Sequence, residues 1–98
     1  MVQEIRALLT ARKLLVAKLR DVESSLRGIL RGFGLKVGAI SKGRFEARIR
    51  ELVAGQAMLE RIAEPLLRAR AALRAEYASL HGELLKAVRA DEVCRRLM

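Results

Sequence analysis

Leucine recurs at every seventh position through the second half of the chain. The residues are Leu52, Leu59, Leu66, Leu73 and Leu80. The first half has apolar residues three, four or seven apart. They include Leu8, Leu15, Leu19, Val22, Leu26 and Ile29. Such spacing is typical of helices that bury one face against another helix. We therefore expect an all-α fold in which these residues make the helix contacts.

The positions of glycine predict where the helices end. Five glycines fall close together, at Gly28, Gly32, Gly34, Gly38 and Gly43. Glycine costs about 1 kcal/mol per helix position relative to alanine, so a turn is expected there. The sequence predicts an antiparallel helical hairpin, one helical region over residues 1–98 with a short helix near the turn. Its segments are a helix over about 2–31, a basic glycine-rich turn over about 32–42, a short helix over about 42–54, a second long helix over about 57–90, and the start of a further, truncated domain over 91–98.

Four residues carry finer expectations. Phe33 lies seven residues after Leu26, which places it on the apolar face of the first helix. Ser41 is the expected N-cap of the short helix. Pro65 lacks a backbone donor, and we expect it to kink the second long helix, because the seven-residue register passes through it unbroken. Asp91 is expected to begin another short helix.

The charge favours a polyanionic partner. Twenty Lys and Arg against eleven Asp and Glu give 20 − 11 = +9, which suits nucleic acid or an anionic membrane surface. Residues 1–54 carry 12 − 5 = +7 and residues 55–98 carry 8 − 6 = +2.

Seven lysines and arginines lie around the expected turn, between residues 27 and 50. Glu46 is the one carboxylate in that stretch. The seven cations are Arg27, Arg31, Lys36, Lys42, Arg44, Arg48 and Arg50. Arginine binds phosphate through two parallel hydrogen bonds, and such contacts carry no base information. This segment is our candidate for contact with DNA or structured RNA, without sequence-specific readout. The alternative is a solvated basic turn that has no ligand.

Residues for catalysis are scarce. His81 is the only histidine, Cys94 the only cysteine, and no pair of residues has metal-ligand spacing. We therefore expect no catalytic residue, metal or cofactor. A single cysteine excludes an internal disulfide and fits a reducing compartment. No apolar run approaches a membrane span, so we expect a cytoplasmic chain without a membrane partner.

Seven segments, in order along the chain, resemble the middle region of one bacterial transposase family. They are residues 3–15 (QEIRALLTARKLL), 18–23 (KLRDVE), 26–35 (LRGILRGFGL), 44–48 (RFEAR), 51–55 (ELVAG), 64–67 (EPLL) and 93–98 (VCRRLM). The family is the insertion-sequence "one-ten" family, also called bridge-RNA-guided recombinases. The resemblance covers nearly the whole chain.

Members of that family have an N-terminal RuvC-like domain with four acidic catalytic residues, a coiled-coil region, and a C-terminal domain with a nucleophilic serine. This chain is similar to the coiled-coil region alone, so no catalytic position of the family falls on it. Two departures stand out. The Pro-Gly-Val-Gly stretch that usually opens the C-terminal domain is absent, and Glu92 replaces a proline common before the Val–Cys pair.

The resemblance implies a truncated transposase fragment, bacterial and non-enzymatic, whose parent carries out DNA transposition. Its expected partners are DNA or a structured guide RNA, together with further copies of itself or full-length relatives. The rival interpretation is an independent small basic helical dimer that acts as a nucleoid-associated or regulatory protein. A third, an enzyme using Cys94 or His81, has little in the sequence to favour it.

Overall fold

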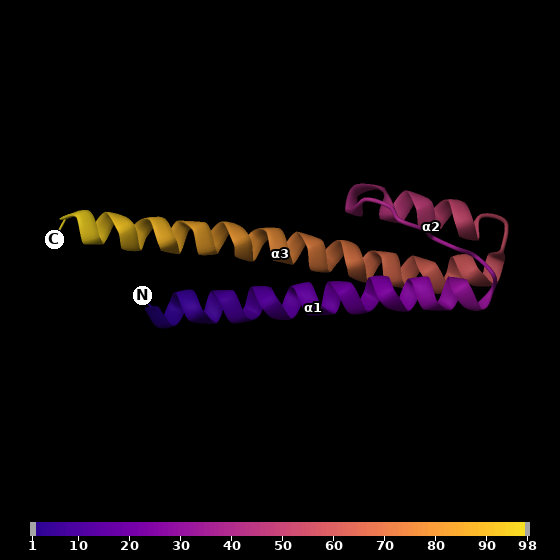
Figure 1. The fold of residues 1–98 in the computed structure, drawn as a ribbon, viewed down its shortest axis with the longest axis horizontal. Coiled ribbons are helices and arrows are strands. Elements are labelled where there is room, and N and C mark those ends of the chain that lie inside the picture. The colour runs from indigo at the N-terminus through magenta and orange to yellow at the C-terminus, as the bar shows by residue number, and fades with distance from the viewer. Residues whose placement is uncertain (1, 98) are drawn as a thin grey trace. The chain divides into compact units, whose positions relative to one another are not determined.

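The computed structural model describes the backbone of residues 2–97 and the side chains of residues 2–91. Its elements are the helix α1 (Val2–Gly32), a single 3₁₀ turn (Lys42–Arg44), the helix α2 (Phe45–Val53) and the helix α3 (Ala57–Leu97). The long helices α1 and α3 run side by side and pack against each other (Figure 1). The predicted all-α helical hairpin is confirmed.

The C-terminal end of α1 is closed by backbone hydrogen bonds. The amide of Leu35 donates to the carbonyl of Leu30 at 2.9 Å, and the amide of Gly34 donates to the carbonyl of Arg31 at 2.9 Å. This pair of bonds is the Schellman motif, which requires a left-handed residue after the helix. Gly34 supplies it with φ 78°. Glycine therefore ends α1 where the sequence predicts.

Within the chain two compact units are distinguishable. The turn unit comprises residues 20–71, and the terminal unit comprises residues 1–19 and 72–98. Each contains one part of α1 and one part of α3. They are described separately.

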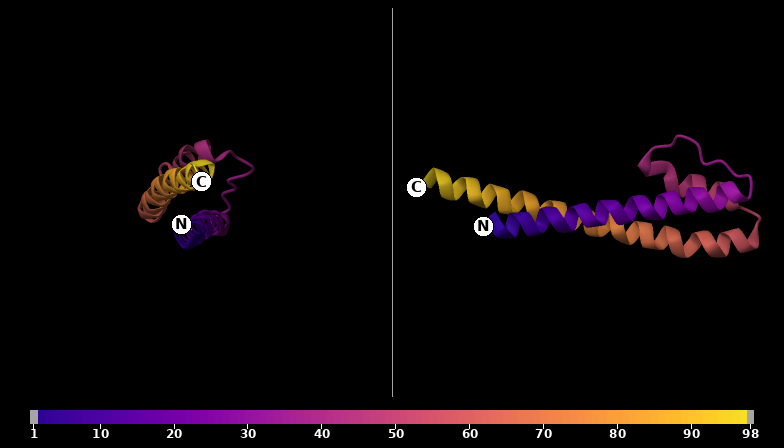
Figure 2. Two further views of the ribbon diagram at one scale, coloured as in Figure 1. Left: turned by 90° about the vertical axis from the view of Figure 1, so that its left-hand side faces the viewer. Right: turned by 60° about the horizontal axis from the view of Figure 1, so that its bottom comes forward.

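The turn unit has a core made by three helices and the loop. Phe45, Ile49 and Val53 of α2 are buried, and they pack with apolar residues of α1, the loop and α3. Those residues are Leu26, Leu30, Val37, Leu59, Ala63 and Leu67. The spacing of the α2 residues, four apart, gives that helix one apolar face. Figure 2 shows α2 beside the α1 and α3 segments of this unit.

The leucines of the seven-residue repeat are buried to different degrees. In the turn unit Leu59 is buried, whereas Leu52 and Leu66 are half-buried. Residues of α3 next to the row, Ala63 and Leu67, are more deeply buried. The reason is α2: it packs on a second side of α3, so the buried stripe is wider than one heptad row.

The terminal unit is a two-helix pair. Leu19 of α1 and Leu84 of α3 are buried, and the remaining seam residues are half-buried. They include Ile5, Leu8, Leu15, Leu73, Tyr77 and Leu80. Side chains three and four apart thus line this seam on both helices.

Three of the four finer expectations need correction. Phe33 is 60% exposed rather than packed, because α1 ends at Gly32 and the heptad count no longer applies. Ser41 does precede the 3₁₀ turn, but its side chain makes no capping hydrogen bond. Pro65 needs no correction: it lies inside α3, which continues through it as the unbroken register predicts. Asp91 begins no new helix, since neither glycine nor proline interrupts α3 there and the helix runs on to Leu97.

No helix in the described part of the chain combines the length and the apolar character needed to cross a bilayer. The side chain of Cys94 lies outside the described side chains.

Candidate nucleic-acid interface

The seven candidate cations all lie in the turn unit, and the structure separates them into two sets. Arg27, Arg48 and Arg50 make hydrogen bonds within the unit. The other four, the exposed basic set, have solvent-exposed side chains, as Arg50 does, and Lys42 among them also has an interaction within the chain. The exposed basic set is Arg31, Lys36, Lys42 and Arg44.

Two of the hydrogen-bonded arginines hold the loop between α1 and α2. Arg48 donates from Nε to the carbonyl of Val37 at 3.3 Å and from Nη2 to the carbonyl of Lys36 at 3.2 Å. Arg27 donates from Nη1 to the carbonyl of Gly38 at 2.8 Å. These bonds satisfy three successive loop carbonyls with charged donors, which bind more strongly than neutral ones. The loop is thereby fixed without secondary structure of its own.

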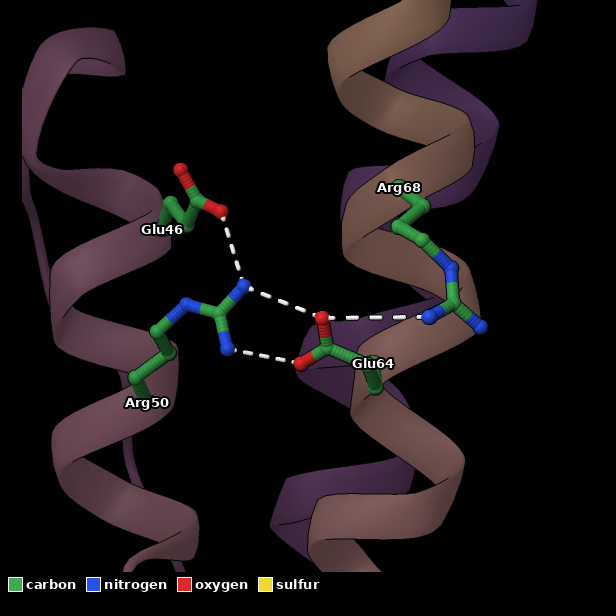
Figure 3. A network of polar contacts seen from close by, with 4 residues as sticks. All are labelled: Glu46, Arg50, Glu64 and Arg68. Carbon is green, nitrogen blue, oxygen red and sulfur yellow. Dashed lines mark hydrogen bonds and ion pairs between the residues drawn. The ribbon is translucent and has the colours of Figure 1, made fainter.

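Arg50 joins α2 to α3 through an ion-pair network (Figure 3). Its two terminal nitrogens contact the two carboxylate oxygens of Glu64 at 2.6 and 3.3 Å, and Nη2 also reaches Glu46 at 3.1 Å. Arg68 lies 4.0 Å from Glu64 on the other side. The hydrogen bond from Arg50 lowers the pKa of Glu64 below its ordinary value of 4.5. The bonds from Glu64 and then Glu46 raise the pKa of Arg50. Two carboxylates therefore balance the charge of Arg50.

Arg70 is the most buried charged residue described, at 3% exposed. Its Nε donates to Glu23 at 2.7 Å and its Nη2 to the carbonyl of Lys42 at 2.8 Å. The guanidinium also lies 4.5 Å from the ring centroid of Phe45, within the range of a cation–π contact. Arg70 thus links α1, the loop and α2 from its place on α3. The sequence pattern gives no sign of these partners, which are distant in sequence.

The exposed basic set occupies a segment that has no acidic residue of its own. Between Glu23 and Glu46 the sequence has no carboxylate side chain. A hollow of about 240 Å³ lies in this segment, and three of its lining residues are cations. Its lining residues are Arg27, Arg31, Leu35, Lys36, Val37 and Gly38. The 3₁₀ turn that carries Lys42 and Arg44 leads into the N-terminus of α2, where the helix dipole also favours anions.

The terminal unit contains a polar contact of a different kind. Arg12 donates from Nε to the Tyr77 hydroxyl at 3.2 Å, and the rings of Tyr77 and His81 are stacked with centroids 6.0 Å apart. The Nδ1 atom of His81 is buried and has no hydrogen-bond partner among the described residues. Among the residues that the structure describes, no three His, Cys, Asp or Glu side chains lie together as metal ligands would.

No protein-family model, curated protein or solved structure matches this chain.

Proposed function

We propose that the turn unit binds nucleic acid through the phosphates, without reading base sequence. The observation that carries the proposal is the exposed basic set on a segment that has no carboxylate between Glu23 and Glu46. Lysine and arginine neutralise phosphates and release condensed counterions, which supplies most of non-specific affinity. The nucleic acid is DNA or a structured RNA.

The internal bonds of the unit support this assignment. Arg27, Arg48 and Arg70 bind carbonyls of the loop residues Lys36–Gly38 and of Lys42, so the backbone that carries the exposed cations is held in place. A fixed backbone loses less entropy when a phosphate binds than a flexible one would. Arg48 and Arg70 thus hold the backbone of two members of the exposed basic set, Lys36 and Lys42.

The resemblance to the coiled-coil region of the insertion-sequence "one-ten" transposases gives the proposal its context. A helical hairpin with a basic turn fits a part that contacts DNA or guide RNA and that brings subunits together. On this proposal the chain itself is non-catalytic, and transposition belongs to the family that it resembles.

Assembly with a second copy is the other half of the proposal, and it rests on the terminal unit. Val2, Leu9, Leu85 and Val88 are exposed there. Beside Leu9, an open hollow of about 580 Å³ on α1 is bordered by basic and apolar side chains, namely Arg6, Thr10, Arg12, Lys13 and Val16. The exposed carboxylates Glu76 and Glu83 on α3 of a second copy would complement that basic border.

Phosphate binding is tested with a fluorescein-labelled DNA duplex, by anisotropy at a series of salt concentrations. The test variant replaces Arg31, Lys36 and Arg44 by glutamine. We expect weaker binding of this variant and a shallower salt dependence, because each lost phosphate contact removes about 0.9 from the slope of log K against log salt. Two unrelated duplex sequences should bind alike.

The control for this experiment replaces Lys18, Lys86 and Arg89 by glutamine, which removes the same charge from exposed positions of the terminal unit. Equal losses in the two variants would mean that net charge alone matters and would refute the site. Wild-type affinity that does not change with salt would refute phosphate binding itself.

Assembly is tested by sedimentation at tens of micromolar. We expect a dimer or larger species for the wild type, and a lower mass when Leu9 and Leu85 are both replaced by glutamate. A wild-type monomer under these conditions would refute this half of the proposal.

A further inference from the structure

Phe33 is exposed on a rigid piece of backbone. It lies between the last residue of α1 and Gly34, inside the Schellman motif. Its own amide donates to the carbonyl of Leu30 at 3.0 Å, so the backbone is bonded at this residue and on its C-terminal side. The motif also sets Leu30 in the core and Leu35 against it. The Phe33 side chain nevertheless remains 60% exposed.

The chain on either side of Phe33 leaves its ring accessible. Gly32 and Gly34 flank it, and a Cβ added at either glycine would meet no atom within 4 Å. A planar group that approaches the ring therefore meets no side chain from these neighbours. A ring that is held on a fixed backbone loses few conformations when it is covered, which favours stacking.

The charges near Phe33 suit a nucleobase with phosphates on each side. Arg31 and Lys36 precede and follow it, and both are exposed. The C-terminal end of α1 carries a partial negative charge, which disfavours a phosphate directly at the helix end. The face of a base is uncharged and is not repelled there. Single-stranded nucleic acids are bound in this way, by an aromatic ring for the base and cations for the backbone.

We propose that Phe33 stacks on an unpaired nucleobase while Arg31 and Lys36 hold the neighbouring phosphates. The ligand class is single-stranded nucleic acid, or an unpaired loop of a folded RNA. The inference rests on the proposed function, and it adds a preference for unpaired bases to a contact that otherwise depends on phosphate alone.

The sequence offers a direct probe of this contact. The chain has no tryptophan and one tyrosine, Tyr77, so Phe33→Trp introduces a single tryptophan at the proposed stacking position, which can be excited selectively at wavelengths that tyrosine does not absorb. We expect its emission to be quenched when a single-stranded oligonucleotide is added. An abasic oligonucleotide with the same number of phosphates should quench it far less.

Affinity is measured in parallel by anisotropy. Phe33→Ala should weaken binding of the single strand by about tenfold, as expected for one lost base–aromatic stack. Its binding of the abasic strand should not change. The matched control is Met58→Ala, which removes another exposed apolar side chain of the turn unit; it should bind both strands as the wild type does.

The outcomes separate the two proposals. If Phe33→Ala binds every strand as the wild type does while the Arg31, Lys36 and Arg44 variant binds less, stacking is refuted and phosphate binding stands. If the wild type binds no nucleic acid at all, both proposals fail. If the emission of the Phe33→Trp variant shifts to the blue with anionic phosphatidylserine vesicles and is insensitive to oligonucleotides, the exposed ring is a membrane contact and the stacking proposal is wrong.

Discussion

Among single residues, the arginines of the turn unit differ in what surrounds them. Arg70 is buried against Glu23, the Lys42 carbonyl and the Phe45 ring. Arg31 and Arg44 are exposed. A buried guanidinium is tolerable only when its hydrogen bonds are made, whereas an exposed one keeps its water and its ability to bind an external anion. Arg70 is therefore committed to contacts inside the turn unit, whereas Arg31 and Arg44 are the arginines that we propose to bind phosphate.

Arg70→Met should lower the free energy of unfolding by about 3 kcal/mol or more, because it leaves the Glu23 carboxylate and a loop carbonyl without their donor. Urea unfolding monitored by circular dichroism measures the loss. Arg68→Met serves as the control, since the Arg68 side chain is 69% exposed; its effect should stay within about 0.5 kcal/mol. Equal losses in the free energy of unfolding for the two variants would contradict a stabilising role for the Arg70 contacts.

Glu64 gives a prediction about pH. Its pKa lies below the ordinary value of 4.5 because Arg50 donates to the carboxylate. The stabilisation from this pair is therefore fully present above about pH 4.5 and is lost as the pH falls through the lower folded-state pKa. We expect Glu64→Gln to be less stable than the wild type at pH 7, with the difference shrinking in acid. A difference in unfolding free energy that is the same at pH 7 and pH 3 would contradict the ion pair.

At the level of helices, two glycines of α1 and its cap should respond to substitution in opposite directions. Gly28 lies inside the helix with open space around it, so Gly28→Ala should raise stability by about 0.5–1 kcal/mol. Gly34 has φ 78° in the helix cap, so Gly34→Ala should lower stability by about 1–2 kcal/mol. Thermal or urea unfolding of the two variants measures both changes in stability. If both alanines stabilise the chain, the cap is not formed by Gly34.

Helices and their approximate ends were predictable from the sequence because they depend on local properties. Apolar spacing predicts α1, α2 and α3, and the glycines predict the turn. The predicted helix start at Asp91 was wrong. Aspartate suits an N-cap, but an N-cap forms only where the preceding helix has ended, and neither glycine nor proline ends α3 there. The predicted burial of Phe33 was wrong because heptad counting assumes that the helix continues, whereas α1 ends at Gly32.

The sequence allowed prediction of which residues make up the candidate site, but not of their contacts. The seven cations could be named from the sequence, but the hydrogen bonds that hold Arg27, Arg48 and Arg50 depend on partners eleven or more residues away. Arg48 reaches the loop carbonyls and Arg50 reaches Glu64 only because α2 folds back beside α1 and α3 within the turn unit. No spacing rule encodes such contacts.

At the level of the whole molecule, the two units differ in how they are completed. The turn unit has a three-helix core and an exposed basic set. The terminal unit is a helix pair with Leu9, Leu85 and Val88 exposed. We infer that one unit provides the contact to nucleic acid and the other the contact to a second copy. Variants in one unit should therefore leave the function of the other intact.

The central claim is that nucleic acid binds the turn unit at the exposed basic set. Its most direct test is a titration of the ¹⁵N-labelled chain with a short oligonucleotide, followed by backbone amide chemical shifts. We predict that the largest changes fall on residues 31–44 and diminish as salt is raised. Changes confined to the terminal unit, or none at oligonucleotide concentrations in excess of protein, would contradict the claim.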